Sequence, residues 1–395
     1  MYLTKDEEKT FNGERGEVYQ KAIKVIVKVG EALGAERLID ISSAHASGLS
    51  YNNIGDPGLE FLEDLARKGA KAAVQATLNP IGYDTTKQVI PLPQGFAEKQ
   101  LRIINAFRSM GFSITLSCTP YYFKMPNFGE HLAWGESSAV IYANTAIGAR
   151  TNREGGPLSV LAALIGKTYY AGLHVDEQRK PSIVVDVKLD GVTDSTAGWL
   201  GLKIGETVKE GIPYIRVKNL SDSALRIMLA AMAASGSIGM AFVEGITKEH
   251  ADISGLERIE INADDFPGAL SAATGEGSDL YFIGCPHASI EDMRDLLSYF
   301  DKYGHVARGK RFWITTGSNV YKEAAEKGIA DQLLGHGAEI IVDTCPVVAP
   351  LGGMFKRIAT NSGKSFFYLS KVHGSTVRIM SSEMLVKEAS EEVVT

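Results

Sequence analysis

Residues 280–345 read LYFIGCPHASIEDMRDLLSYFDKYGHVARGKRFWITTGSNVYKEAAEKGIADQLLGHGAEIIVDTC, and this stretch decides the fold class. Its apolar runs at 280–284, 311–316 and 339–344 have the length and the β-branched and aromatic content of buried strands. The segments between them, 290–300 and 320–337, carry apolar residues at helical spacing. Strands that alternate with helices across short turns predict βαβ units and a mostly parallel sheet.

The N-terminal part of the chain shows the same alternation. We predict helices over 16–33, 59–68 and 97–110, and strands that end near Ser43, Asn79 and Cys118. The predicted fold class is therefore α/β over the whole chain.

The domain organisation follows from this pattern. We expect an N-terminal α/β region over 1–215 and a C-terminal α/β domain over 216–395. The segment 129–211 is richer in glycine and small polar residues, and we predict loops and helix starts there that line a cleft.

Composition excludes several classes of function. The chain has 395 residues, of which 45% are apolar, and a net charge of −6 without a basic stripe, so nucleic-acid binding is not expected. The first residues are polar and lack the apolar core of a signal peptide, so we expect a cytoplasmic protein. The uncharged stretch 227–243 is interrupted by serines and glycines, and it predicts a buried helix followed by a strand, not a membrane span.

The three cysteines share one context. Each ends an apolar, strand-like run and is followed by proline within two positions: Cys118, Cys285 and Cys345. Ligands of open α/β sheets bind where strands end, so one interpretation is a shared metal or cluster site. The other is that each cysteine is a small core hydrophobe, which is common for this residue. An odd cysteine count in a reducing compartment argues against a disulfide framework.

Polar residues at two strand ends are candidates for substrate binding. A loop follows the strand near Ser43, and its hydroxyls and glycine backbone can hold an anion: Ser43, His45, Ser47, Gly48, Leu49 and Ser50. A plain polar turn is the alternative for this loop. Asn79 and Pro80 end the next strand, where proline can equally be only a strand stop.

Charged residues in later segments complete the candidate site. Glu136, next to Ser137, is our candidate for a catalytic or substrate-binding carboxylate, with a helix-terminal charge as the alternative. Arg150 and Arg153 suit a carboxylate or phosphate, although one of them can instead brace its loop through a salt bridge. Lys364 can reach an anionic group as a point charge.

Two histidines are further candidates for the same site. His174 and His287 can lie in a pocket, and the alternative for each is a hydrogen-bonded structural histidine.

Five motifs together carry a family resemblance. In chain order they are SCTPYYF, ESSAVIYANTAIGARTNREGG, GLHVDEQRKP, IGCPHAS and DTCPVVAP, and with them the chain resembles the large subunit of the aconitase X family. The resemblance implies an aconitase-like α/β fold, with multiple three-layer α/β/α units around a central cleft. It also implies that Asn79 and Pro80 form a pocket wall.

The resemblance further implies a cofactor and a partner. The family's iron–sulfur cluster falls on Cys118, Cys285 and Cys345, with a 4Fe-4S cluster as the leading form and a smaller cluster or mononuclear iron left open. The swivel domain that carries the family's serine base has no room in this chain. We therefore expect a separate small subunit that supplies this serine.

The implied activity is that of a hydro-lyase. We expect the large catalytic subunit of an enzyme that dehydrates (R)-5-phosphomevalonate to trans-anhydromevalonate 5-phosphate in an isoprenoid pathway. The alternative is cis-3-hydroxy-L-proline dehydratase, but the run SFFYLS after Lys364 departs from what those relatives lead us to expect. An alternative of another class is a non-catalytic iron-binding regulatory protein, for which the acidic composition offers RNA no basic surface.

Overall fold

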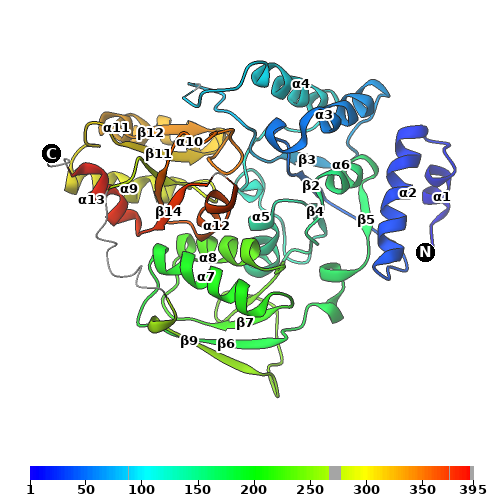
Figure 1. Cartoon of the computed structure of the whole chain (residues 1–395). Coiled ribbons are helices and arrows are strands. Elements are labelled where there is room, and N and C mark those ends of the chain that lie inside the picture. The colour runs from blue at the N-terminus through cyan, green and yellow to red at the C-terminus, as the bar shows by residue number, and fades with distance from the viewer. Residues whose placement is uncertain (88, 267–276, 373, 392–395) are drawn as a thin grey trace. The chain divides into compact units, whose positions relative to one another are not determined.

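The computed structural model describes residues 1–87, 89–266, 277–372 and 374–391 (Figure 1). The chain forms two compact units that interleave in sequence. The first unit comprises 1–82, 92–181 and 239–252, and the second comprises 83–91, 182–238 and 253–395. Our expected boundary at residue 215 stays a prediction.

A short parallel sheet organises the first unit. The strands β2 (Ser43–Ala46), β3 (Gln75–Leu78) and β4 (Leu132–Trp134) run parallel, with β2 in the middle. A separate antiparallel pair joins β1 (Leu38–Asp40) to β5 (Lys167–Tyr169). The helices of this unit are α1 (Lys5–Phe11), α2 (Glu17–Ala32), α3 (Tyr51–Arg67), α4 (Phe96–Ser109), α5 (Ser137–Tyr142) and α6 (Gly156–Ile165).

The remaining elements of the first unit are short. They are the helical turns η1 (Pro120–Tyr122), η2 (Ala143–Ile147), η3 (Gly172–His174) and η4 (Asp176–Gln178), and the strand β8 (Phe242–Val243). The turn η2 has π-helical geometry.

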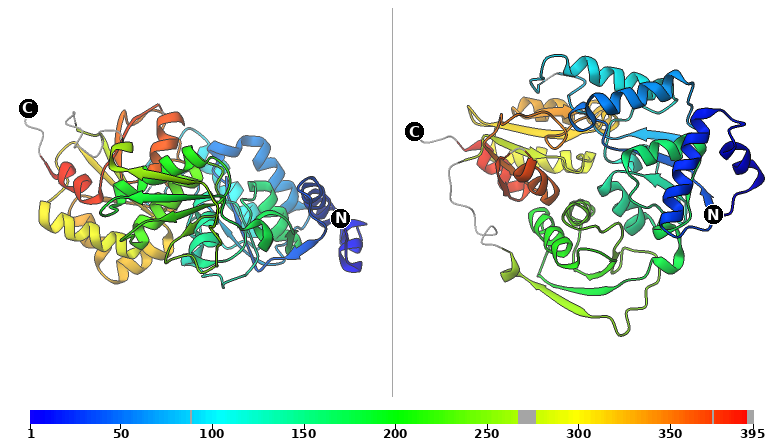
Figure 2. Two further views of the ribbon diagram at one scale, coloured as in Figure 1. Left: turned by 90° about the horizontal axis from the view of Figure 1, so that it is seen from below. Right: turned by 45° about the vertical axis from the view of Figure 1, so that its right-hand side comes forward.

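The three helices predicted in this region are confirmed as α2, α3 and α4. The helix α3 begins earlier than predicted, because Ser50 caps it and the helix continues across a kink at Gly55, whose φ is 55°. The helices α3 and α4 run side by side (Figure 2). Glu63 of α3 accepts two hydrogen bonds of 2.8 Å from Arg102 of α4.

The predicted strand that ends at Cys118 is wrong. Only an isolated bridge between Thr77 and Ser113 forms there. The backbone N–H of Leu78 donates to the hydroxyl of Thr115, and Leu116 turns to a φ of 45°. Because the Thr115 hydroxyl accepts the bond that a backbone carbonyl would accept in a regular ladder, the segment 113–118 runs beside β3 without forming a regular strand.

The second unit contains the sheet that the opening stretch predicts. Its five strands are all parallel, in the order β12 (Glu339–Val342), β11 (Arg311–Thr316), β10 (Leu280–Ile283), β13 (Arg357–Thr360) and β14 (Thr376–Ile379). The helices that accompany them are α9 (Ile290–Tyr303), α10 (Ser318–Glu326), α11 (Ile329–Gly335), α12 (Gly363–Val372) and α13 (Ser382–Ser390). The single helix predicted over 320–337 is two helices, because Gly328 adopts a φ of 70°.

A second parallel ladder lies in the same unit. The strand β6 (Ile183–Lys188) pairs with β7 (Pro213–Arg216) on one side and with β9 (Arg258–Asn262) on the other, and the short turn η5 (Ala263–Asp265) follows. The helices α7 (Asp194–Val208) and α8 (Asp222–Ser235) lie side by side near it (Figure 1). They pack closely, since a Cβ added at Gly201 would lie 2.2 Å from the carbonyl oxygen of Met228.

Two expectations about the middle of the chain have different outcomes. The helix and strand predicted over 227–243 are confirmed as α8 and β8. The segment 129–211 contains more regular structure than predicted, including β6 and the whole of α7. The apolar, valine-rich run of β6 finds strand partners in β7 and β9. Within the described ranges, no helix is long and apolar enough to cross a membrane.

Candidate active-site residues

The carboxyl edge of the first unit's sheet gathers several predicted residues. Parallel strands end at the same edge, so the loop after β2, Asn79 after β3 and Glu136 after β4 all come to that edge. Backbone hydrogen bonds fix them there: Asn79 N–H donates to Ala46 at 2.9 Å, and Gly135 N–H donates to His45 at 2.9 Å.

The loop at residues 47–50 is held from two sides. A Cβ at Gly135 would lie 2.5 Å from Ser47 Oγ, and a Cβ at Gly156 would lie 2.7 Å from the Ser47 carbonyl oxygen, so only glycine allows these approaches. The amide of the buried Gln100 donates to the carbonyl of Leu49 at 3.0 Å and accepts from the N–H of Tyr51 at 2.8 Å. Gln100 therefore fixes this loop, a role that its position in a helical pattern did not reveal.

A cavity of about 280 Å³ adjoins this loop. Its walls are mostly apolar, and they include Gly48, Leu49, Ile54, Phe61, Phe107 and Val160. The helix α3 begins directly beyond the loop, with Ser50 accepting from the N–H of Asn52 at 3.3 Å. A helix N-terminus favours an anion, which suits an anionic substrate group.

Asn79 and Glu136 are hydrogen-bonded to each other. Asn79 Nδ2 donates to Glu136 Oε2 at 2.8 Å, and both residues are buried. The other oxygen, Glu136 Oε1, accepts from the N–H and the hydroxyl of Ser138 at 3.3 and 3.1 Å. Glu136 is thus the N-cap of α5, as our structural alternative for it expects, and its carboxylate stays aligned with Asn79.

Ser43 lies away from this group. It begins β2, at the amino end of the strand, while Ser47 follows its carboxyl end. Its hydroxyl accepts from the indole N–H of Trp134 at 3.2 Å. A four-residue strand spans roughly 10 Å, so Ser43 and Ser47 do not meet.

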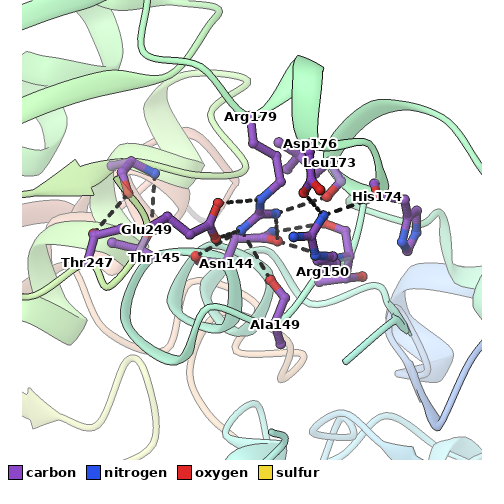
Figure 3. A network of polar contacts seen from close by, with 12 residues as sticks. Asn144, Thr145, Ala149, Arg150, Leu173, His174, Asp176, Arg179, Thr247 and Glu249 are labelled. Carbon is purple, nitrogen blue, oxygen red and sulfur yellow. Dashed lines mark hydrogen bonds and ion pairs between the residues drawn. The ribbon is translucent and has the colours of Figure 1, made fainter. Parts of the chain in front are cut away.

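A buried arginine, Arg179, organises a polar network in the first unit (Figure 3). Arg179 forms an ion pair with Glu249 and donates to the side chain of Asn144 and the carbonyl of Leu173, each at 2.9 Å. Asn144 in turn accepts from the N–H of Thr151 at 3.1 Å, and the hydroxyl of Thr151 accepts from Trp134 N–H at 3.0 Å. This chain of contacts ends two residues before Glu136.

The two predicted arginines differ in their surroundings. Arg150 forms an ion pair with Asp176, the bracing contact that our alternative expects (Figure 3). Arg153 is exposed, and its backbone bridges to Trp134. His174 is buried, with its Nδ1 at 3.0 Å from Nδ1 of His131, as a structural histidine would be. Substrate binding by either arginine stays a prediction.

Glu154 is a buried carboxyl that the sequence analysis missed. Its oxygens accept from the hydroxyls of Thr168 and Tyr169 at 3.1 and 3.2 Å. Burial outweighs these two hydrogen bonds and raises the pKa of Glu154 to about 7. The backbone carbonyl of Glu154 also approaches Gly135, where an added Cβ would lie 3.0 Å from it.

In the second unit, two cysteines follow strands of the same parallel sheet. Cys285 comes after β10 and Cys345 after β12, so both lie at its carboxyl edge. His287 Nε2 lies 3.1 Å from the carbonyl oxygen of Thr344 and ties the two turns together. Burial, with a further contribution from Cys285, raises the pKa of the Cys345 thiol to about 12, while the nearby Lys364 lowers it.

The donor set fits a thiolate-bound metal group in part. All three cysteines are buried thiols, and Cys285, Cys345 and the buried Lys364 are neighbours in the second unit. Cys118 belongs to the first unit. Among the described residues, no three His, Cys, Asp or Glu side chains are grouped closely enough to hold a metal ion. The three-cysteine site therefore stays a prediction.

Comparisons with known proteins identify the family. Models of the aconitase X first, second and third domains match residues 1–177, 181–271 and 278–391. The chain belongs to the aconitase X family. The resemblance inferred from the five motifs is confirmed, and so is the α/β fold class.

Several aconitase X relatives match over almost their whole length. The phosphomevalonate dehydratase large subunit of Thermococcus kodakarensis is 42% identical over 98% of this chain and 100% of the relative, and that of Aeropyrum pernix is 40% identical over 99% and 100%. The crystal structure of Thermococcus kodakaraensis aconitase X in its holo-form has a TM-score of 0.92 at 41% identity, with 98% and 100% of the two chains covered. A cis-3-hydroxy-L-proline dehydratase of Pseudomonas aeruginosa is 30% identical over 93% of this chain, which spans 66% of that relative.

Replacing Arg179 tests the support behind Glu136. Arg179→Met leaves Glu249 as a partly buried charge without its partner, and we expect the free energy of unfolding to fall by about 3–5 kcal/mol. Arg150→Met is the matched control, because its partner Asp176 is exposed, and it should cost about 0–1 kcal/mol. Urea unfolding measures both values. Equal losses would show that the Arg179 network does not hold this region together.

The raised pKa of Glu154 predicts a pH dependence. The folded protein holds this proton more tightly than the unfolded chain, so the contribution of Glu154 to stability is fully present below pH 4.5, the ordinary pKa of this side chain, and is lost as the pH rises through about 7. This loss amounts to about 3 kcal/mol. Glu154→Gln stays neutral, so its free energy of unfolding should fall less than that of the wild type between pH 5 and pH 8. If the free energy of unfolding of Glu154→Gln and of the wild type changed in parallel with pH, the assignment would be contradicted. Glu177→Gln, which changes an exposed carboxyl, is the control and should follow the wild type.

Proposed function

We propose that this chain is the large catalytic subunit of a phosphomevalonate dehydratase that converts (R)-5-phosphomevalonate to trans-anhydromevalonate 5-phosphate. The observation that carries the proposal is the near full-length similarity to aconitase X large subunits that bear this name. The cis-3-hydroxy-L-proline dehydratases are more distant, and this chain spans only about two thirds of their length. We place the reaction in the cytoplasm, where thiols stay reduced.

We infer that Cys118, Cys285 and Cys345 hold the iron–sulfur cluster, with 4Fe-4S as the expected form. Family membership supports this, as does the burial of all three thiols. A cluster usually takes four thiolates, so three leave one metal position open. When bound, such a cluster supplies a Lewis acid for the departure of hydroxide from carbon 3 of the substrate.

The chain's own residues bind and orient the substrate in this proposal. The loop 47–50 holds an anionic group through its backbone N–H groups, and the positive end of the α3 dipole lies next to it. Asn79 and the Glu136 carboxylate, next to Ser137, hold the polar groups around the reacting carbons, and Pro80 forms the wall beside them. Lys364 supplies a positive charge near Cys345. Binding energy spent on orientation lowers the barrier because it removes the entropy cost of alignment.

The base that removes the proton from carbon 2 is assigned to a partner. We propose that a small swivel-domain subunit supplies a serine for this step. The words "large subunit" in the relatives' names support the existence of such a partner, and the family resemblance implies its serine. The large subunit alone should then bind substrate without turning it over. Positioned proton transfer typically contributes about 10²- to 10⁴-fold to a rate.

An anaerobic turnover assay tests the proposal. The iron-reconstituted chain is assayed with and without the small subunit, against 5-phosphomevalonate and against cis-3-hydroxy-L-proline. We expect turnover of 5-phosphomevalonate only when the partner is present. Turnover of cis-3-hydroxy-L-proline alone would show that this compound, and not 5-phosphomevalonate, is the substrate. Iron binding without turnover of either compound would favour the non-catalytic alternative.

Cysteine variants belong to the same experiment. Cys118→Ser, Cys285→Ser and Cys345→Ser should each abolish activity and the visible absorbance of the cluster, while the circular dichroism of the fold is retained. Any one of them that keeps full absorbance would remove that cysteine from the set of ligands.

A further inference from the structure

His45 lies inside the sheet, out of reach of solvent. It occupies the central strand β2, in register with Thr77 of β3 and Trp134 of β4, and its exposed fraction is 0%. The Trp134 ring packs edge-on against it, with ring centroids 6.2 Å apart. The neighbours of His45 therefore block direct contact with a substrate, although we predicted from the sequence that His45 lies in a loop that holds an anion.

His45 is part of a line of hydrogen bonds that ends at Glu136. Thr77 Oγ1 lies 2.8 Å from His45 Nδ1, and His45 Nε2 lies 3.4 Å from Asn79 Oδ1. On its other side, Asn79 Nδ2 donates to Glu136 Oε2 at 2.8 Å. Two side chains on adjacent strands, Thr77 and His45, and two that follow strands, Asn79 and Glu136, thus form one continuous path.

The carboxylate at the end of this path sets the direction of every bond. An ionised carboxylate only accepts, so Asn79 must turn its NH₂ group toward Glu136 and its carbonyl toward His45. That carbonyl also only accepts, so His45 must carry its proton on Nε2. Nδ1 is then an acceptor for the Thr77 hydroxyl. Burial lowers the pKa of His45 to about 4, so the ring is neutral near pH 7 and has a single N–H.

The opposite tautomer is the competing state. Thr77 Oγ1 also lies 3.4 Å from the carbonyl oxygen of Ala44, and a hydroxyl proton given to that oxygen would let His45 donate from Nδ1 instead. Nε2 would then face Asn79 as an acceptor, and the amide would have to turn its oxygen toward Glu136. Two acceptors in contact in a buried place are unfavourable, so the Nε2–H form prevails.

We propose that His45 is a positioning residue that fixes the amide orientation of Asn79, so that Asn79 and Glu136 meet the substrate in one defined arrangement. This proposal rests on the proposed function, in which Asn79 and Glu136 contact 5-phosphomevalonate. It assigns His45 an indirect role, in place of the direct substrate contact expected from the sequence.

Two substitutions separate this role from plain packing. The amide nitrogen of glutamine can take the place of Nε2 and donate to Asn79, while the shorter asparagine side chain reaches only the place of Nδ1. With the small subunit and 5-phosphomevalonate, His45→Asn should lose about 10- to 100-fold in kcat/KM, the equivalent of one unmet buried hydrogen bond. His45→Gln should stay close to the wild type, and both variants should keep the cluster absorbance.

Equal activity losses in the two variants, in step with equal losses of thermal stability, would overturn the proposal, because a purely structural histidine would behave in that way.

A second measurement does not depend on activity. Proton–nitrogen spectra of the histidine-labelled large subunit report the tautomer of each ring, and the His45 signals are those that vanish in His45→Gln. We expect a neutral Nε2–H ring at pH 7, and an Nδ1–H ring would overturn the proposal. If the wild-type complex fails to turn over 5-phosphomevalonate while His45 shows the Nε2–H form, the proposed function fails and the orientation of Asn79 by His45 stands.

Discussion

The parallel direction of the strands is the constraint on which the candidate site depends. Parallel strands end at one edge of their sheet, so each residue that follows a strand arrives beside the residues that follow its neighbours. In the first unit this brings together the loop after His45, Asn79 and Glu136. In the second unit it brings Cys285 and Cys345 to one edge. Chemistry-bearing residues far apart in sequence therefore become neighbours without any long loop.

Burial then decides how these groups behave. A polar side chain taken out of water must find partners, and the described residues near Glu136 do so through chains of hydrogen bonds, from Thr77 through His45 and from Arg179 through Asn144. Burial also favours the uncharged form of each group. It lowers the pKa of His45 and raises those of Glu154 and Cys345. A buried thiol such as Cys345 loses its proton readily only where a metal ion or another positive charge stabilises the thiolate.

The sequence predicted the fold class because strand and helix periods are local properties. The runs at 280–284, 311–316 and 339–344 became β10, β11 and β12, since apolar strands of this length have few other ways to be buried. The run that ends at Cys118 has a similar composition but is not a strand. There, the hydroxyl of Thr115 accepts the hydrogen bond from the Leu78 N–H. This contact joins segments far apart in sequence, so the local pattern could not predict it. Helix ends shifted for comparable reasons, as the cap at Ser50 and the kink at Gly55 show for α3.

The sequence pointed to several residues that the structure brings together, but it did not show the contacts between them. Asn79 was chosen for its place after a predicted strand and Glu136 as a carboxylate beside Ser137, but the bond between them needed the structure. Gln100 and Glu154 were missed, because nothing in a helical pattern or a glycine-rich loop marks a side chain that will be buried against a neighbouring loop. We grouped Ser43 with Ser47 because they are close in sequence. The strand β2 lies between them, so they are at opposite edges of the sheet.

The central claim is that three thiolates hold a cluster with one open iron position at which 5-phosphomevalonate is dehydrated. The Mössbauer spectrum of the anaerobically reconstituted chain, recorded with the small subunit before and after 5-phosphomevalonate is added, tests it most directly. We predict one iron that is distinct from the rest and whose signal alone shifts with substrate. A spectrum of equivalent irons that substrate leaves unchanged would contradict the account.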